Sequence, residues 1–507
     1  MLFNSYAFIF VFLPLTLAGF FLIGRFSTAY AAAWLAAASL VFYGHWNVVY
    51  VPLLLASIVF NHGVGVRLAA QPSRALLTAG VTANLLLLGY FKYADFFVGN
   101  LNTLGILSEG LTLPGVILPL GISFFTFTQI AFLVDVYQRK AAEPSFIHYG
   151  LFVTYFPHLI AGPVLHHKEM MPQFARAESY RFEWENVAVG LTIFFIGLAK
   201  KVLIADGVAE YARPVFDAAG KGVALSTIDA WGGALAYTFQ LYFDFSGYSD
   251  MAIGLSRMMG VRLPLNFASP YKAASIIDFW RCWHMTLSRF LRDYLYVPLG
   301  GNRKGPARRY VNLLLTMVLG GLWHGANWTF VVWGALHGFY LLVNHAWRAL
   351  GWTVMSGRLG RIVSVTLTFL CVVVAWVYFR ADTLTQANAI IAAMAGANGV
   401  TLPYRWVDKL GAVGTWLSTH GVLFQNTATF GGGTQINWLL ICALITWLAP
   451  NTQQLMRGFT PALGVGDEQA KSLRWQPSAR WLAATALLGA FGILSLTALS
   501  EFIYFQF

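Results

Sequence analysis

A histidine lies deep within an apolar stretch of the chain. His324 falls in the segment 310–347, which contains no lysine, arginine, aspartate or glutamate. A helix that starts at Val311, after the basic cluster 303–309, reaches His324 after about 13 residues, or ~20 Å into a bilayer roughly 30 Å thick. An ionisable residue at that depth is a candidate functional residue. A neutral imidazole can act as a general base, which suits acyl transfer to a hydroxyl group.

The residues beside His324 favour chemistry over the alternative, a neutral histidine that hydrogen-bonds a neighbouring helix. Glycines flank it and would let a substrate approach the backbone closely. Trp323 and Trp328 are candidate pocket walls, and Asn327 is a candidate partner for a bound donor. Two further histidines in the same stretch have spacings that suit no metal pair, so we expect them to make structural hydrogen bonds: His337 and His345.

A second group of chemically active side chains lies between residues 278 and 294, where charge and aromatic rings alternate. The segment is too charged for a lipid-facing span and too apolar for a solvated loop. We therefore expect an amphipathic or re-entrant helix on the cytoplasmic side. His284 and Asp278 could orient a thioester, although a membrane-surface helix without a ligand is an equal alternative. The arginines that could hold phosphate groups are Arg281, Arg289 and Arg292.

Two other polar groups in apolar surroundings are expected to be structural. Residues 240–250 carry two aspartates and several hydroxyl groups, and buried carboxylates require partners. Arg281, Lys200 and Lys201 are the expected ion-pair partners. His158 lies in a run bracketed by prolines, which is typical of a kinked or broken helix. The polar residues assigned to the first group are Asp244, Ser246, Tyr248 and Asp250.

These residues must be positioned by helices that cross a membrane. Of the 507 residues, 58% are hydrophobic and only 11% are charged, whereas soluble domains carry about 25% charged residues. The apolar runs predict an all-α polytopic membrane protein with about 11 transmembrane helices and some re-entrant or interfacial helices. We expect one membrane domain over residues 1–507, with an extramembrane loop near 401–435 and an uncleaved first span.

The net charge of +12 does not indicate nucleic acid, because the basic residues fall in short loops between apolar runs. Such loops set topology and contact anionic lipid headgroups, and they could attract an anionic cytoplasmic substrate. Three cysteines show no metal-like spacing, and no serine nucleophile elbow, zinc motif or phosphate-binding glycine loop is present. We therefore expect no metal, and a histidine base is the simplest acyl-transfer chemistry that remains.

The ordered motifs along the chain resemble those of the membrane-bound O-acyltransferase (MBOAT) family, and its alginate O-acetyltransferase branch in particular. The resemblance extends from Phe3 to the terminal aromatic residues 504–507. Its motifs are 122–124 (Ile-Ser-Phe), 157–163 (Pro-His-Leu-Ile-Ala-Gly-Pro), 242–250, 279–284 (Phe-Trp-Arg-Cys-Trp-His) and 323–325 (Trp-His-Gly).

The resemblance implies a ring of helices around a central funnel, with the essential histidine of the Trp-His-Gly motif at its floor. That position is His324 here, and a second family histidine matches His284. Cys282 departs from the pattern, because the family often has another arginine there, and this removes one possible phosphate contact. The resemblance also implies a multi-pass protein of the bacterial inner membrane that takes acetyl groups from cytoplasmic acetyl-CoA. A periplasmic acetyltransferase partner would then decorate a secreted polysaccharide.

The acceptor polymer stays open at this point. Related proteins acetylate alginate, cellulose or peptidoglycan, and the segments 401–435 and 451–454 look closer to the cellulose-acetylating relatives. Two rival classes also remain: a transporter or channel for an acetylated precursor, and a structural membrane anchor for a soluble acetyltransferase. The absence of an internal repeat weakens the transporter interpretation.

Overall fold

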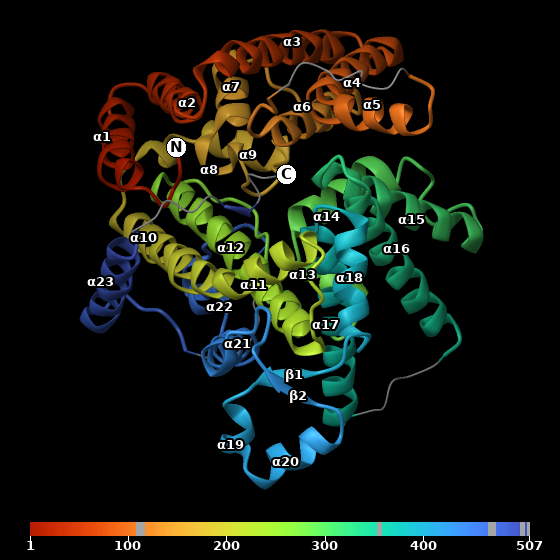
Figure 1. Cartoon of the computed structure of the whole chain (residues 1–507). Coiled ribbons are helices and arrows are strands. Elements are labelled where there is room, and N and C mark those ends of the chain that lie inside the picture. The colour runs from red at the N-terminus through yellow and green to blue at the C-terminus, as the bar shows by residue number, and fades with distance from the viewer. Residues whose placement is uncertain (108–116, 352–356, 465–472, 497–501, 504–507) are drawn as a thin grey trace. The chain divides into compact units, whose positions relative to one another are not determined.

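The computed structural model describes residues 1–107, 117–351, 357–464, 473–496 and 502–503 (Figure 1). The aromatic C-terminal residues 504–507 lie outside the described residues. Two compact units can be distinguished, each of which combines segments that are distant in sequence. One comprises residues 1–199, 246–266 and 450–507, and the other comprises residues 200–245 and 267–449.

Helices make up the first unit in its described residues, apart from connecting segments and one isolated β-bridge between Pro264 and Leu463. Several of its helices begin where a serine side chain accepts a hydrogen bond from the backbone N–H three residues further on, as Ser27 and Ser73 do. Its α-helices are α1 (Leu13–Gly24), α2 (Thr28–Gly44), α3 (Val51–Ala70), α4 (Arg74–Leu88), α5 (Ala94–Thr103), α6 (Ile122–Tyr137), α7 (Phe146–Thr154), α8 (Phe156–Leu159), α9 (His167–Phe174), α10 (Trp184–Ala199), α22 (Thr452–Leu455) and α23 (Ala479–Leu494).

The second unit carries most of the candidate site residues. Its helices are α11 (Asp206–Gly220), α13 (Ile276–Cys282), α14 (Met285–Leu291), α15 (Gly305–His324), α16 (Trp328–Ala349), α17 (Gly357–Arg380), α18 (Leu384–Met394), α19 (Trp406–Leu410), α20 (Ala412–Thr419) and α21 (Gly432–Leu448). The long helix α12 (Thr227–Met258) passes from this unit into the first one.

The length and composition of the helices agree with a membrane protein. Among the described residues, four helical stretches are long and apolar enough to cross a bilayer: Val48–Ala70, Arg74–Thr103, Trp184–Gly220 and Gly357–Arg380. Six shorter apolar helices accompany them. The predicted total of about 11 spans, which includes α15 and α16, stays a prediction.

The segment expected to be an extramembrane loop contains regular structure. β1 (Thr401–Pro403) pairs in parallel with β2 (Leu423–Gln425), and α19 and α20 lie between them in the chain. α21 then begins at Gly432, inside the expected loop. The all-α prediction therefore needs one small correction. In this polar segment, backbone N–H and C=O groups form hydrogen bonds between two short strands.

Candidate active site

His324 is placed by a tight helical hairpin formed by α15 and α16. His324 is the last residue of α15, and Gly325 turns the chain into extended backbone before α16. A Cβ atom at Gly321 would lie 2.2 Å from the carbonyl oxygen of Phe330, and one at Gly325 would lie 2.1 Å from the Phe330 ring. The two helices can pack this closely only because glycine occupies both positions.

This packing corrects the expectation that the glycines leave room for a substrate. Atoms of Phe330 on α16 already fill the space beside Gly321 and Gly325. The glycines therefore position His324 by close helix packing, and any substrate must approach the imidazole from another direction.

The structure brings the two predicted histidines together. The ring centroids of His284 and His324 are 6.5 Å apart, and both side chains are buried. His284 lies in the turn between α13 and α14, so residues distant in sequence meet at one place. Aromatic rings surround His324: Trp323 at 4.9 Å, Trp333 at 5.1 Å and Phe379 at 5.2 Å between centroids. We call His284, Trp323, His324, Trp333 and Phe379 the histidine cluster.

His284 has an unusual backbone conformation. Its φ and ψ angles are 42° and 53°, in the left-handed region that non-glycine residues rarely adopt. The Phe245 ring of α12 packs edge-on against its imidazole at 4.8 Å. His284 lies outside the long apolar helices, and burial lowers its pKa to about 3, so the imidazole is neutral at physiological pH.

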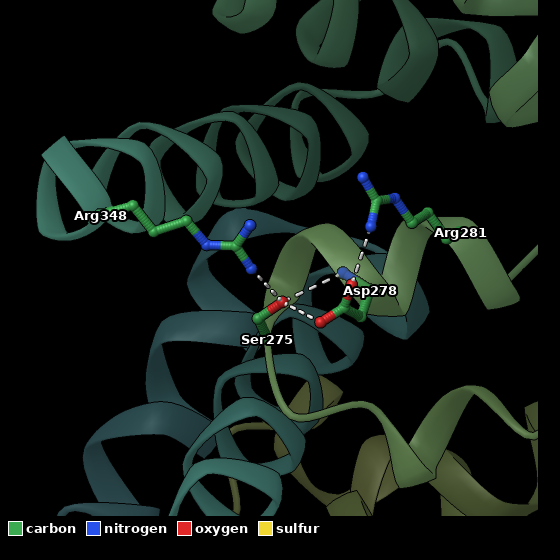
Figure 2. Close-up of polar contacts among 4 residues, drawn as sticks. All are labelled: Ser275, Asp278, Arg281 and Arg348. Atoms are coloured by element: carbon green, nitrogen blue, oxygen red, sulfur yellow. Dashed lines mark hydrogen bonds and ion pairs between the residues drawn. The ribbon is translucent and has the colours of Figure 1, made fainter. Parts of the chain in front are cut away.

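A polar network begins at the other end of α13 (Figure 2). The Ser275 hydroxyl accepts a hydrogen bond from the backbone N–H of Asp278 and donates one of 2.6 Å to its carboxylate. Arg281 Nη1 lies 3.2 Å from the same carboxylate. Arg348, near the end of α16, donates to the Ser275 hydroxyl at 3.3 Å. We call Ser275, Asp278, Arg281 and Arg348 the arginine network.

The arginine network is exposed where the histidine cluster is buried. The Arg281 side chain is 70% exposed and that of Asp278 is 41% exposed. Asp278 therefore lies with the arginines rather than beside His324, and it holds the helix terminus and Arg281. Arg292 is also exposed, and it makes two hydrogen bonds with Asp293. Arg289 lies half-buried on α14.

The predicted ion pair of Asp244 is confirmed. Lys201 Nζ lies 2.8 Å from the carboxylate of Asp244 and 2.9 Å from that of Asp206. The side chains of Lys201 and Asp244 are almost fully buried. Arg281, another of the expected partners, pairs with Asp278 instead. Two carboxylates around one ammonium group compensate a charge that would be costly to bury alone.

Three other predicted polar residues of α12 are Ser246, Tyr248 and Asp250, and all three are buried. Asp250 accepts hydrogen bonds from the Thr452 hydroxyl at 2.5 Å and from the Gln453 amide at 3.3 Å. The ring of Tyr248 is buried against Phe3 and Phe502, and Ser246 is buried nearby on α12. The expected ion-pair network thus accounts for Asp244, whereas hydrogen bonds to neutral side chains stabilise Asp250.

His158 lies on the short helix α8 in the first unit. Its Nε2 atom is 2.8 Å from the backbone carbonyl oxygen of Phe152, and its side chain is buried. This contact agrees with the structural role expected for His158. His345, on α16, hydrogen-bonds to Arg309, as the sequence predicts.

The residues after Gly325 form the start of α16. The side-chain Oδ1 atom of Asn327 accepts a hydrogen bond from the backbone N–H of Thr329, and its side-chain Nδ2 atom donates one of 2.8 Å to the backbone carbonyl oxygen of Asp382. These contacts explain Asn327 as a helix cap without any ligand. The Trp328 side chain is half exposed. The tryptophan of α16 that packs beside His324 is instead Trp333, five residues further along the helix.

Sequence reasoning missed four residues of these two sites: Ser275, Trp333, Phe379 and Arg348. A hairpin of α15 and α16 implies that residues at matching depth on the two helices meet, and this signal could have identified Trp333. Phe379 and Arg348 reach the sites through contacts between elements that are distant in sequence, for which the sequence holds no local signal. Among the described residues, no group of three or more histidine, cysteine, aspartate or glutamate side chains could hold a metal ion.

The helical membrane architecture and the paired histidines define a class, the membrane acyltransferases, and comparisons with known proteins identify the family. The model of the MBOAT, membrane-bound O-acyltransferase family matches residues 82–379. The chain belongs to this family, as its motifs predict, and it is an acyltransferase.

Its relatives differ in the acceptors that their names specify. A peptidoglycan O-acetyltransferase from Helicobacter pylori is 46% identical over 437 residues, which cover 79% of this chain and 81% of that protein. A probable alginate O-acetylase AlgI from Pseudomonas aeruginosa is 41% identical over 540 aligned residues that cover all of both chains. A teichoic acid D-alanyltransferase from Streptococcus thermophilus is 26% identical over 253 residues, 47% of this chain and 60% of that protein.

Proposed function

We propose that this protein is an O-acetyltransferase of the bacterial inner membrane. It takes acetyl groups from cytoplasmic acetyl-CoA and delivers them across the membrane, where a periplasmic partner completes O-acetylation of a secreted polysaccharide of the alginate or cellulose type. The observation that carries the proposal is the approach of two buried histidines, His284 and His324, at 6.5 Å between ring centroids. Family membership favours this activity over a transporter or a passive membrane anchor.

The chemistry assigns His324 as the general base. Its imidazole takes the proton from the acceptor hydroxyl group as the oxygen attacks the thioester carbonyl carbon. The carbon–sulfur bond then breaks, and the imidazolium returns the proton to the departing thiolate. His284 supports this step as a neutral hydrogen-bonding group, because burial keeps it uncharged.

The arginine network is the proposed site for the phosphate groups of the donor. Arg281 and Arg348 are held to the same small group of side chains by Asp278 and Ser275 (Figure 2). Guanidinium groups bind phosphate with directional, charge-assisted hydrogen bonds. Cys282, where the family often has another arginine, leaves Arg348 as the second positive charge at this place.

Peptidoglycan is the second candidate acceptor. The relative from Helicobacter pylori, named as a peptidoglycan O-acetyltransferase, is 46% identical to this chain over 437 residues. The acceptor must be identified chemically. Deletion of the gene, followed by measurement of ester-linked acetate on the exopolysaccharide and on peptidoglycan, distinguishes the two candidates.

The decisive experiment compares wild-type protein with His324→Ala in vesicles supplied with radiolabelled acetyl-CoA. Wild type should release free coenzyme A and transfer label, and His324→Ala should lose at least about a hundredfold of this turnover, the usual contribution of a general base. His420→Ala is the matched control, because this histidine lies on the exposed turn after α20. Full turnover by His324→Ala would refute the catalytic assignment, and transport without any consumption of acetyl-CoA would favour a transporter.

A further inference from the structure

His337 does not make the structural hydrogen bond expected for it. Its side chain is completely buried on α16, and neither ring nitrogen has a hydrogen-bond partner in the part of the chain that the structure describes. A neutral imidazole has one N–H donor and one acceptor nitrogen, and buried polar atoms in native proteins are almost always hydrogen-bonded. The position of His337 therefore calls for a partner that the described residues do not supply.

Aromatic rings enclose His337. Phe279 lies parallel to the imidazole at 5.9 Å, and Trp280 and Trp333 approach it edge-on at 5.1 Å and 4.9 Å between centroids. Trp376 lies at 6.0 Å. We call these five residues, Phe279, Trp280, Trp333, His337 and Trp376, the aromatic box.

The aromatic box contains more polar atoms without partners. The indole Nε1 atoms of Trp280 and Trp333 are buried, and neither has a hydrogen-bond partner among the described residues. Their rings lie 5.9 Å apart, so the three rings with orphaned nitrogens are mutual neighbours. Trp376 is different, because its indole N–H donates to the Tyr271 hydroxyl at 3.2 Å.

The orphaned donors lie directly beside the histidine cluster. Trp333 belongs to both groups, with its ring 5.1 Å from His324 on one side and 4.9 Å from His337 on the other. A ligand that used these nitrogens would therefore lie next to the general base. Two indole N–H groups and one imidazole N–H present hydrogen-bond donors in an apolar surrounding, and their natural complement is a set of uncharged carbonyl oxygens.

We propose that His337, Trp280 and Trp333 bind the amide and thioester carbonyl oxygens of the acyl donor and so place its acyl carbon beside His324. The inference rests on the proposed function and deepens it, because it assigns the uncharged part of the donor to the aromatic box and the phosphates to the arginine network. His337 is a donor-positioning residue, and the proton transfer itself remains with His324.

The test uses the full-length protein in vesicles with two donors: acetyl-CoA, and S-acetyl-N-acetylcysteamine, which keeps a thioester and an amide but lacks phosphates. His337→Phe preserves a ring of similar shape and removes both nitrogens. We expect this variant to raise the KM for both donors about tenfold while its thermal midpoint stays equal to or above that of wild type, because it removes orphaned polar atoms. Trp280→Phe should raise both KM values in the same direction.

A purely structural role for His337 makes the opposite prediction. A His337→Phe variant with wild-type KM for both donors would overturn the inference, and so would a change confined to stability. The companion variant Trp280→Phe decides the matter if His337→Phe does not fold, because an unchanged KM there is equally incompatible with donor binding.

Failure of the proposed function gives a different pattern. If wild type consumes acetyl-CoA and His324→Ala does not, the proposed function holds, and unchanged kinetics of His337→Phe then overturn only the further inference. If wild type consumes neither donor, the proposed function fails and the inference fails with it.

Discussion

The histidine cluster and the arginine network are both built on α13, α16 and their neighbours, yet they have opposite environments. The cluster has buried rings and no formal charge at neutral pH on His284. The network has two guanidinium groups and a carboxylate, and the side chains of Arg281 and Asp278 are largely exposed. Ser275, Asp278 and Arg281 of the network lie along α13, and His284 of the cluster follows the end of this helix by two residues, so one short segment fixes the spacing between the two groups.

This difference separates two kinds of interaction energy. Hydrogen bonds and proton transfers among buried groups are not screened by salt, whereas exposed charges are screened beyond about 10 Å at 0.1 M ionic strength. If the donor contacts both regions, substitutions in the histidine cluster should mainly lower kcat. Substitutions in the arginine network should mainly raise the KM for the donor. Four predictions test this division.

The largest effect is expected for His284→Ala, which removes a ring 6.5 Å from that of His324. We expect kcat to fall by about 10²–10³ with little change in the KM for acetyl-CoA, because the loss affects the reacting groups. The His284→Ala/His324→Ala double variant should be little slower than His324→Ala, because residues that act together are not additive. Fully multiplicative losses would show that the two histidines act independently.

The next effect is expected for Gly321→Ala. The added Cβ would lie 2.2 Å from the Phe330 carbonyl oxygen, so the α15–α16 hairpin must open, at a cost of about 1–3 kcal/mol. The thermal midpoint and kcat should fall together, because His324 shifts with the hairpin. Gly63→Ala is the matched control, because its added Cβ meets nothing within 4 Å. Equal stability of the two variants would contradict the packing role of Gly321.

A smaller effect is expected for Arg281→Ala combined with Arg348→Ala. The double variant should raise the KM for acetyl-CoA by about tenfold at low salt and leave kcat unchanged, and added salt should reduce the difference. S-acetyl-N-acetylcysteamine, which has no phosphates, should be used equally well by variant and wild type. Arg358→Ala, at the exposed start of α17, controls for the loss of a positive charge. A tenfold penalty with both donors would place these arginines elsewhere in the mechanism.

The smallest effect is expected for Ser275→Ala, which removes the cap of α13 and the acceptor of Arg348. Loss of a serine cap costs about 1 kcal/mol, so the thermal midpoint should fall by a few degrees. The KM for acetyl-CoA should rise slightly, because Arg281 and Arg348 are no longer held to the same group. An unchanged midpoint would show that the cap contributes no stability here.

Residues with an unusual local sequence context could be predicted from the sequence. His324 and His284 lie in motifs with local signals, such as an uncharged run and a dense aromatic–charge segment, and the predicted ion pair between Asp244 and Lys201 is confirmed. The family resemblance was likewise confirmed. A local sequence pattern is informative where an ionisable residue lies within an otherwise apolar run.

Contacts between distant segments were harder to predict. The glycines beside His324 proved to receive Phe330, because a glycine in sequence does not reveal whether a ligand or another helix occupies its free space. Trp333 and Phe379 reach His324 from α16 and α17, and Arg348 reaches Ser275 from the end of α16. The short strands β1 and β2 pair across a connection whose polar composition predicts only a loop.

The left-handed backbone of His284 carries an evolutionary consequence. A non-glycine residue in that conformation costs roughly 1–2 kcal/mol, and glycine would adopt the same φ of 42° without penalty. Replacement by glycine would release that strain but would empty the space of a buried imidazole that packs against Phe245, and the loss of a large buried side chain costs about 2–5 kcal/mol. Selection for stability and selection for turnover therefore both keep a side chain at residue 284, so directed evolution of this enzyme for stability should retain His284.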